Sequence, residues 1–188
     1  MARIPYLTRD DLAPENKDLL ARDINLFRAL AHAPEAARSF LGLAQHIRFK
    51  SRLEPRLREL AILQVGYMSS SAYEYSHHVK IGREFGVTES DLEGLIAESQ
   101  SKPNKLEPVA RAVLQAAREM TAGPSISQAS FARLGHFFGN AQLVELVMII
   151  GFYIGVVRML ASLEIDVEDE YKRFLAPLAP IGGAPSAE

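Results

Sequence analysis

No stretch of this chain alternates apolar and polar residues for long, and this absence restricts the possible folds most strongly. A strand with one buried face repeats its apolar side chains every second residue, whereas a helix repeats them every three or four residues. Nearly all of the 188 residues follow the helical period, and a chain of this length can bury one sizeable core. We therefore predict an all-α fold in which residues 1–188 form a single domain.

Prolines, glycines and capping residues predict where the helices begin and end. Pro34 and Pro55 suit the first turn of a helix, where the missing N–H of proline costs nothing. Gly86 is suited to end a helix, and the sequence TESD from Thr88 is an acidic variant of the capping box. Further residues that can cap a helix are Asn25, Ser127 and Asn140. The predicted helices span residues 12–23, 25–32, 34–47, 56–69, 72–85, 88–98, 108–120, 127–138 and 140–163.

The most apolar run, residues 146–157, is predicted to be a buried core helix. It lies between Glu145 and Arg158 and is shorter than the ~20 residues that span a bilayer. The N-terminal sequence MARIPYLTRDDLAPENKDLL lacks the apolar centre of a signal peptide. We therefore expect a cytoplasmic protein with no membrane partner. The tail over residues 181–188 is expected to be frayed.

The composition excludes several classes of function. Lys and Arg number 21 and Asp and Glu number 23, which gives a net charge of −2. A nucleic-acid partner is not expected, because binding to phosphates needs a concentrated positive charge. The chain has no cysteine, which excludes disulfides, thiolate metal sites, iron–sulfur clusters and cysteine nucleophiles.

The predicted helix 72–85 carries ionisable groups on the face that should point inward. Glu74, Tyr75 and His78 share this face with apolar residues. The opposite face holds Lys80 and further charged side chains, so we expect it to face solvent and to include His77. A carboxylate and an imidazole are thus predicted to lie one turn apart inside the protein.

Glu59 is a third ionisable group predicted to point inward, because it aligns with apolar positions on its own helix. Buried ionisable groups cost several kcal/mol unless they are paired, so Glu59, Glu74 and His78 are expected to meet. Such a cluster would have shifted pKa values and could transfer protons near neutral pH.

Two other interpretations of this cluster remain open. Glu59 and His78 could form a structural pair that holds two helices together. Alternatively, two carboxylates and one histidine could hold a metal ion, which would make the protein a metal-dependent enzyme. Our preferred interpretation needs neither a metal ion nor a cofactor.

Two segments of the chain are similar to one another. Residues 58–63 (RELAIL) resemble residues 144–149 (VELVMI), and Tyr67 and Tyr153 follow at the same distance. This similarity predicts two halves built on one helical plan and packed around a shared core.

The spacing of four residues resembles the signature of the carboxymuconolactone decarboxylase family, whose members include alkylhydroperoxidase D-like proteins. That signature is a glutamate, then a CxxC motif, then a histidine four residues after the second cysteine. Glu59 takes the glutamate position, Ser71 and Glu74 take the cysteine positions, and His78 takes the histidine position. The resemblance covers roughly residues 25–163.

The resemblance implies an alkylhydroperoxidase D-like helical fold with an internal two-half repeat and assembly into homo-oligomers, commonly trimers or hexamers. Val157 and Leu160 occupy the cysteine-like positions of the second half. The resemblance also implies peroxiredoxin-type activity, but that reaction needs a thiolate nucleophile and a resolving thiol. Since Ser71 and Glu74 can be neither, we reject thiol peroxidase activity for this chain.

The decarboxylase branch of the family implies cofactor-free acid–base chemistry of a lyase or isomerase type. The substrate would be a small organic acid or lactone. His78 would be the general acid and base, Glu59 would orient it, and Glu74 would be its partner or a second acid. Ser71 and Tyr75 would line the pocket.

The substrate carboxylate could be held by Arg56 or Arg58. A non-catalytic, homo-oligomeric protein that binds a small ligand is the alternative function.

Overall fold

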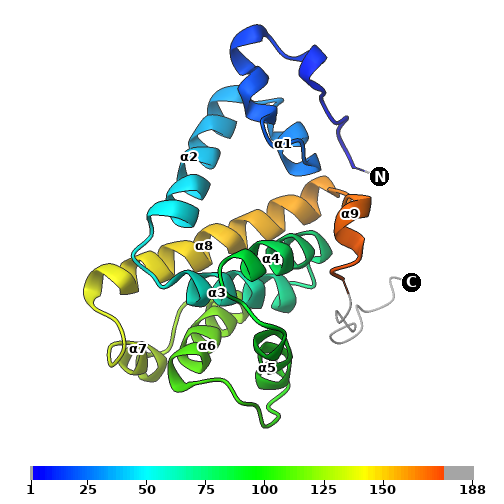
Figure 1. Ribbon diagram of the computed structural model, residues 1–188. Helices are drawn as coiled ribbons and strands as arrows, with labels where there is room; N and C mark the ends of the chain where they lie inside the picture. The colour runs from blue at the N-terminus through cyan, green and yellow to red at the C-terminus, as the bar shows by residue number, and fades with distance from the viewer. Residues whose placement is uncertain (1, 176–188) are drawn as a thin grey trace.

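Helices form all the regular secondary structure of residues 2–175, the part of the chain described by this computed structural model (Figure 1). The all-α prediction is therefore confirmed. The predicted tail, residues 181–188, lies outside the described residues. The elements in chain order are the 3₁₀ helices η1 (Arg9–Asp11) and η2 (Pro14–Leu20) and the α-helices α1 (Asn25–Leu30), α2 (Pro34–Lys50), α3 (Pro55–Met68), α4 (Ala72–Glu84), α5 (Glu89–Ser99), α6 (Pro108–Ala122), α7 (Gln128–Leu134), α8 (Asn140–Leu163) and α9 (Asp169–Lys172).

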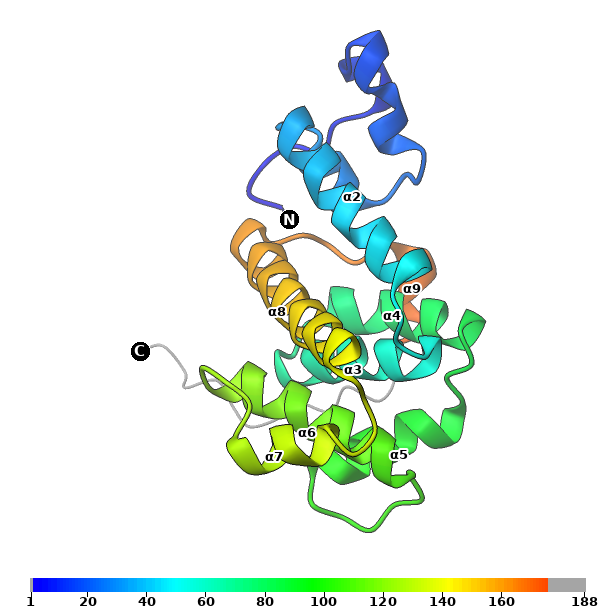
Figure 2. The same ribbon diagram turned by 90° about the vertical axis from the view of Figure 1, so that its left-hand side faces the viewer.

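Helix α3 lies at the centre of the fold and packs against α4, α6 and α8. Every residue from 57 to 67 is buried, which is typical of a helix that is surrounded on all sides. The N-terminal elements through α2 lie on one side of α8, and α5, α6 and α7 lie at the other end of the molecule (Figures 1 and 2). The short helix α9 contacts α4.

Most of the predicted helix boundaries agree with the structure. Pro34 and Pro55 begin α2 and α3. Gly86 follows α4 with a φ of +93°, a conformation that favours glycine. Thr88 forms the predicted capping box with Asp91 at the start of α5.

The prediction was wrong at the N-terminus, where residues 12–23 do not form one helix. Pro14 disfavours the α conformation of the residue before it, so within residues 12–23 helical structure begins at Pro14, as the 3₁₀ helix η2. Asn25 does not cap α1, because Ile24 occupies the cap position and the Asn25 side chain donates to the carbonyl of Asp166. The backbone N–H of Asn25 donates instead to the carboxylate of Glu168, at 2.6 Å.

Helix α8 has 24 residues and extends beyond the apolar run at both ends. It is long and apolar enough to cross a membrane by length and composition, a test that core helices also pass, and 39% of its most apolar window is buried inside the protein. Its inner side chains, among them Leu146, Ile149 and Ile150, belong to the main core. The predicted role of the run as a core helix agrees with this packing, although the argument from its length does not hold for the whole helix.

Candidate active site

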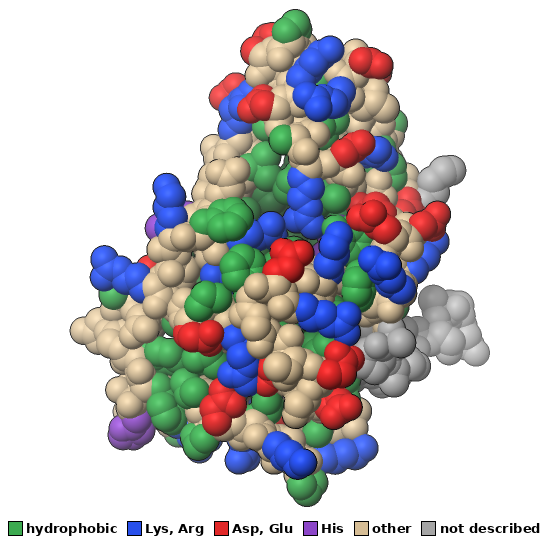
Figure 3. Space-filling model, viewed as in Figure 1, with side chains coloured by type: hydrophobic (Ala, Val, Ile, Leu, Met, Phe, Trp, Pro, Cys, Tyr) green, Lys and Arg blue, Asp and Glu red, His purple; other side chains and the backbone are tan. Residues whose placement is uncertain are grey.

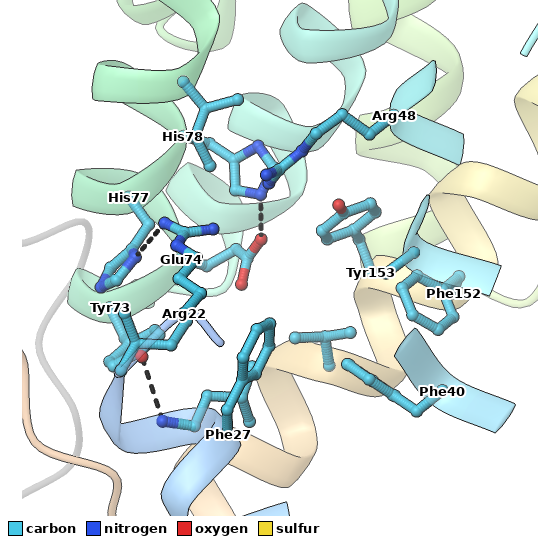
Figure 4. A pocket seen from close by; sticks show the side chains of 15 residues that line it. Arg22, Phe27, Phe40, Arg48, Tyr73, Glu74, His77, His78, Phe152 and Tyr153 are labelled. Atoms are coloured by element: carbon cyan, nitrogen blue, oxygen red, sulfur yellow. Dashed lines mark hydrogen bonds and ion pairs between the residues drawn. The ribbon is translucent and has the colours of Figure 1, made fainter. Parts of the chain in front are cut away.

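The structure brings Glu59, Glu74 and His78 together at the contact between α3 and α4. The Nδ1 atom of His78 lies 2.7 Å from Oε2 of Glu59, within hydrogen-bond distance. The Nε2 atom lies 3.0 Å from Oε1 of Glu74, one turn earlier on α4. All three side chains are buried. The imidazole is thus held between two carboxylates (Figure 4 shows the one from Glu74).

A close approach of the helix backbones makes this convergence possible. Gly66 of α3 lies against α4, where a Cβ atom on Gly66 would be 3.2 Å from the backbone nitrogen of Tyr75. The turn between the helices is tight, because Ser70 adopts a left-handed conformation with a φ of 50°. Glycine at position 66 therefore sets the short distance over which Glu59 reaches His78.

Arg58 balances the charge of Glu59. Its Nε and Nη2 atoms donate to Oε1 of Glu59 at 3.1 and 3.0 Å. Its guanidinium group also lies 4.5 Å from the centre of the Phe85 ring, as in a cation–π contact. The sequence had suggested that Arg58 could hold a substrate carboxylate. Arg58 is only 1% exposed and therefore does not have this role.

Arg56, the other candidate for that role, is also occupied. It donates to Asp91 and to Glu107, and these two carboxylates raise its pKa above its usual range. This ion-pair cluster connects the start of α3 with α5 and with the residue before α6. Arg56 is thus held by two carboxylates of the protein itself.

The charges of the cluster determine the protonation state of His78. Burial alone would lower its pKa, but the carboxylates of Glu74 and Glu59 outweigh burial and raise the pKa of His78 to about 9. Burial would raise the pKa of Glu59, but the adjacent charges of His78 and Arg58 hold that pKa below its usual value. His78 is therefore an imidazolium ion at neutral pH.

Glu74 differs from Glu59 in its hydrogen bonding. Its Oε1 atom is buried and accepts no hydrogen bond from the described residues, although Nε2 of His78 lies 3.0 Å away. The contact is therefore an ion pair without hydrogen-bond alignment. A buried acceptor with no hydrogen bond costs about 1–3 kcal/mol and is therefore rare, and a catalytic role is one of the reasons for which such a group is retained.

Glu74 and His78 border a cavity of about 60 Å³, whereas Glu59 does not reach it. Aromatic rings form much of the opposite wall, from Phe27, Phe40, Phe152 and Tyr153 (Figure 4). Arg22 and Arg48 also line this cavity. The site thus combines an acid–base pair with apolar walls and two cationic side chains.

Ser71 and Tyr75 do not line this cavity, contrary to the prediction. Ser71 caps α4 by accepting a hydrogen bond from the backbone N–H of Glu74. Tyr75 is fully buried, with its ring centre 6.2 Å from that of Tyr67, and its hydroxyl has no hydrogen-bond partner within the described residues. It misses the cavity because α3 covers its face of α4.

His77 is buried, and the prediction that it faces solvent was wrong. Its ring is stacked between those of Tyr73 and Tyr171, at centre distances of 4.2 and 3.6 Å. Its Nε2 atom lies 2.8 Å from the carboxylate of Glu168. Burial is the main cause that lowers the pKa of His77. The C-terminal segment with α9 covers this face of α4, and the pattern of α4 alone gave no sign of that cover.

Glu168 ties the N-terminal segment to α4. Besides contacting His77, it accepts hydrogen bonds from the Tyr73 hydroxyl at 3.0 Å and from the backbone N–H of Asn25. Burial opposes its ionisation, but these hydrogen bonds outweigh burial and lower the pKa of Glu168 to about 2. The contact fixes the segment that carries Phe27 over the cavity.

Arg22, Arg48 and Tyr153 are among the residues of the cavity that sequence reasoning missed. The ring of Tyr153 meets that of His78 edge-on, at a centre distance of 5.0 Å. Burial and the charges of Glu74 and Glu59 raise the pKa of Tyr153 well above its usual value. In the sequence, Tyr153 stood out only because it matches Tyr67 in the two similar segments. Arg22 and Arg48 come from N-terminal elements that no local pattern links to α4.

The cluster is not arranged as a metal site. Within residues 2–175, no group of three His, Asp or Glu side chains is placed to hold a metal ion. Both ring nitrogens of His78 already face carboxylate oxygens, so a metal ion would have to displace one of these contacts.

Comparison with known families confirms the resemblance seen in the sequence. Residues 34–119 match the model of the Carboxymuconolactone decarboxylase family, a segment that contains Glu59, Glu74 and His78. No curated protein matches the chain.

Solved structures share the fold. One is an alkylhydroperoxidase AhpD core, an uncharacterized peroxidase-related protein from Ralstonia eutropha JMP134. It is 21% identical, with a TM-score of 0.75 over 91% of this chain and 94% of that chain. Another is the debrominase Bmp8 in complex with 2,3,4-tribromopyrrole, 17% identical, with a TM-score of 0.77 over 95% of this chain and 100% of that chain. These likenesses establish the alkylhydroperoxidase D-like helical fold.

Proposed function

We propose that this chain, whose residues 34–119 match the model of the Carboxymuconolactone decarboxylase family, performs cofactor-free proton transfer on a small organic acid or lactone. The reaction would be of the lyase or isomerase type. The observation that carries this proposal is the placement of His78 and Glu74, side by side, at the wall of a cavity.

His78 would be the proton donor. Since its pKa is raised to about 9, it carries the proton that a general acid needs at neutral pH. When carbon dioxide leaves a substrate, an electron pair remains on carbon, and the proton of the imidazolium would add there. The neutral imidazole would then regain a proton from water.

Glu74 would be the proton acceptor. Its carboxylate borders the same cavity and lies 3.0 Å from Nε2 of His78. In an isomerisation, Glu74 would remove a proton from one carbon while His78 donates to another. Glu59 does not reach the cavity and would position His78 by holding Nδ1.

Thiol peroxidase chemistry does not fit these residues. The chain has no cysteine, and the residues at the two cysteine positions have other roles. Ser71 caps α4, and Glu74 is paired with His78. We therefore do not extend peroxidase activity from the peroxidase-related structural relative to this chain.

The aromatic walls of the cavity favour a substrate that contains a ring. The debrominase structure shows that a fold of this kind can hold a small ring compound. In this chain, the aromatic side chain of Phe27 lines the cavity and provides apolar surface against which part of such a ring would pack.

A panel of small lactones and carboxylic acids, followed for carbon dioxide release and for proton exchange with deuterated water, tests the proposal. For a substrate that turns over, His78→Gln should reduce the rate by about 100-fold or more, the usual contribution of a general acid. His136→Gln alters an exposed histidine of the same type and should leave the rate unchanged. An unchanged rate in His78→Gln would contradict the assigned role.

A non-catalytic ligand-binding role is the second candidate, and the small volume of the cavity, about 60 Å³, favours it. It predicts that a bound acid raises the melting temperature without any turnover. His78→Gln would then lower the melting temperature only.

A further inference from the structure

A second hollow, of about 200 Å³, adjoins the cavity of the candidate active site. The residues that line both spaces are Arg22, Phe27, Ala44 and Arg48. The two spaces therefore meet at these side chains. On this face, Lys and Arg side chains gather between the N-terminal helices and α4, with apolar and some acidic side chains among them (Figure 3). We call this second space the outer hollow; the two arginines lie where it meets the cavity.

Neither arginine is paired with a carboxylate from residues 2–175. Arg48 is partly buried, and its recorded contact is with the ring of Phe49, 6.0 Å from the guanidinium carbon. Arg22 donates to the Tyr171 hydroxyl at 3.1 Å and lies 3.4 Å from Nδ1 of His77, and neither partner is a carboxylate. By contrast, Arg58 is fully paired with Glu59 in the same region.

The charges around the cavity consequently sum to an excess of positive charge. Glu59 is balanced by Arg58, and Glu74 is balanced by the imidazolium of His78. Arg22 and Arg48 are left over at the junction. Glu168, which lies 2.8 Å from the other ring nitrogen of His77, offsets one of these two positive charges, so that an excess of positive charge remains. A partly buried cation without an anionic partner is unfavourable, and a concave site of one sign attracts a ligand of the opposite charge.

The sizes of the two spaces restrict the ligand further. A cavity of about 150 Å³ holds benzene in another protein. By that measure the inner cavity of about 60 Å³ is too small for a six-membered ring, whereas the outer hollow of about 200 Å³ is large enough. Phe27 and Phe49 provide aromatic surface for a ring in the outer hollow.

We propose that Arg48 and Arg22 form a carboxylate-binding subsite at the junction of the two spaces, and that the ligand is a ring-bearing monocarboxylate. The carboxylate would receive hydrogen bonds from the two guanidinium groups, next to His78 and Glu74. The ring would occupy the outer hollow. This inference rests on the proposed function in that it names the substrate class of the same site. It also replaces Arg56 and Arg58 as the residues that hold the carboxylate.

Binding of benzoate, measured by isothermal titration calorimetry, tests the subsite without any need for turnover. Benzamide has the same ring without the charge, and inorganic phosphate has charge without the ring. Benzoate should bind at least about tenfold more tightly than either compound, because charge-assisted hydrogen bonds to Arg and contact with the ring would both be needed. Benzoate binding should also weaken as salt is added.

Variants locate the binding to Arg48. Arg48→Gln should weaken benzoate binding by about tenfold or more and should leave benzamide binding unchanged. Arg158→Gln removes an exposed arginine of α8 and should change neither. If benzoate binds no better than benzamide, or equally well to Arg48→Gln and Arg158→Gln, the subsite does not exist. If phosphate binds as tightly as benzoate, the ring has no place in the outer hollow and the ligand class is wrong.

Turnover separates this inference from the proposed function. If benzoate binds as expected but His78→Gln does not slow any reaction, the subsite stands and the proposed chemistry fails. If benzoate fails to bind while a neutral lactone is turned over in a His78-dependent way, the chemistry stands and the subsite is overturned.

Discussion

Glu59 of α3 fixes the imidazole of His78 on α4, with Oε2 and Nδ1 only 2.7 Å apart. A carboxylate on one ring nitrogen sets the orientation of a histidine and strengthens the basicity of the ring. The other nitrogen, Nε2, is then directed toward Glu74 at the cavity. The positioning of the candidate acid therefore depends on a residue that does not touch the ligand space.

Removing the charge of Glu59 should destabilise the protein. Glu59→Gln leaves Arg58 and His78 as buried cations with one carboxylate fewer, and breaking a buried pair costs about 3–5 kcal/mol. Urea unfolding measures this loss. Glu84→Gln alters an exposed carboxylate of the same helix as His78 and should change the free energy of unfolding by less than about 0.5 kcal/mol. Equal stability of the two variants would contradict the buried network.

The stability of the protein should depend on pH through His78. Its pKa is 6.5 in the unfolded chain and about 9 in the folded protein, so the protonated form stabilises the fold. The stabilisation, roughly 3 kcal/mol, is fully present below pH 6.5 and is lost as the pH rises through about 9. The difference in unfolding free energy between the native protein and His78→Gln should therefore shrink across this range. A difference that stays constant would show that His78 is not a stabilising cation.

Substitution of a glycine inside the close contact of α3 and α4 should have the opposite effect to substitution of a glycine in open space on α2. Gly66→Ala places a Cβ atom 3.2 Å from the backbone nitrogen of Tyr75 and should destabilise by about 1–3 kcal/mol. Gly42→Ala in α2 meets nothing within 4 Å and should stabilise by about 0.5–1 kcal/mol, because alanine favours the helix. Thermal unfolding of both variants gives the comparison, and a harmless Gly66→Ala would exclude the tight contact.

The hydroxyl groups of Tyr153 and Tyr73 should contribute differently to stability. The Tyr73 hydroxyl donates to Glu168 and accepts from the backbone N–H of Leu26, so Tyr73→Phe should cost about 1–3 kcal/mol. The Tyr153 hydroxyl has no recorded partner among the described residues, and Tyr153→Phe should therefore cost less than about 0.5 kcal/mol. A reversed order in chemical denaturation would show that the two hydroxyl groups are bonded differently.

Sequence reasoning located the helices well where the chain carries local signals. Pro34, Pro55, Gly86 and Thr88 each act through the backbone of their own neighbourhood, so their effects can be recognised without a structure. The convergence of Glu59, Glu74 and His78 was also predictable, because consecutive antiparallel helices must bury the faces that they share.

Features that depend on distant segments could not be predicted in this way. The burial of His77 is due to Tyr171 and Glu168, which lie more than 90 residues further along the chain. Arg22 and Arg48 reach the cavity because the N-terminal segment folds over α4 and α8, and no period within one helix shows such a crossing. Arg58 was misjudged because its partner, Glu59, is adjacent in sequence and accepts from it inside the core.

The pKa of His78 tests the central claim most directly. Nuclear magnetic resonance of the native protein with labelled histidine side chains would follow its titration, and His78→Gln would identify its signal among those of the five histidines. A pKa of about 9 is expected if His78 is a cation held between Glu59 and Glu74. A pKa at or below 6.5 would mean that His78 is neutral in its buried position, and it would then not be the proton donor that this account requires.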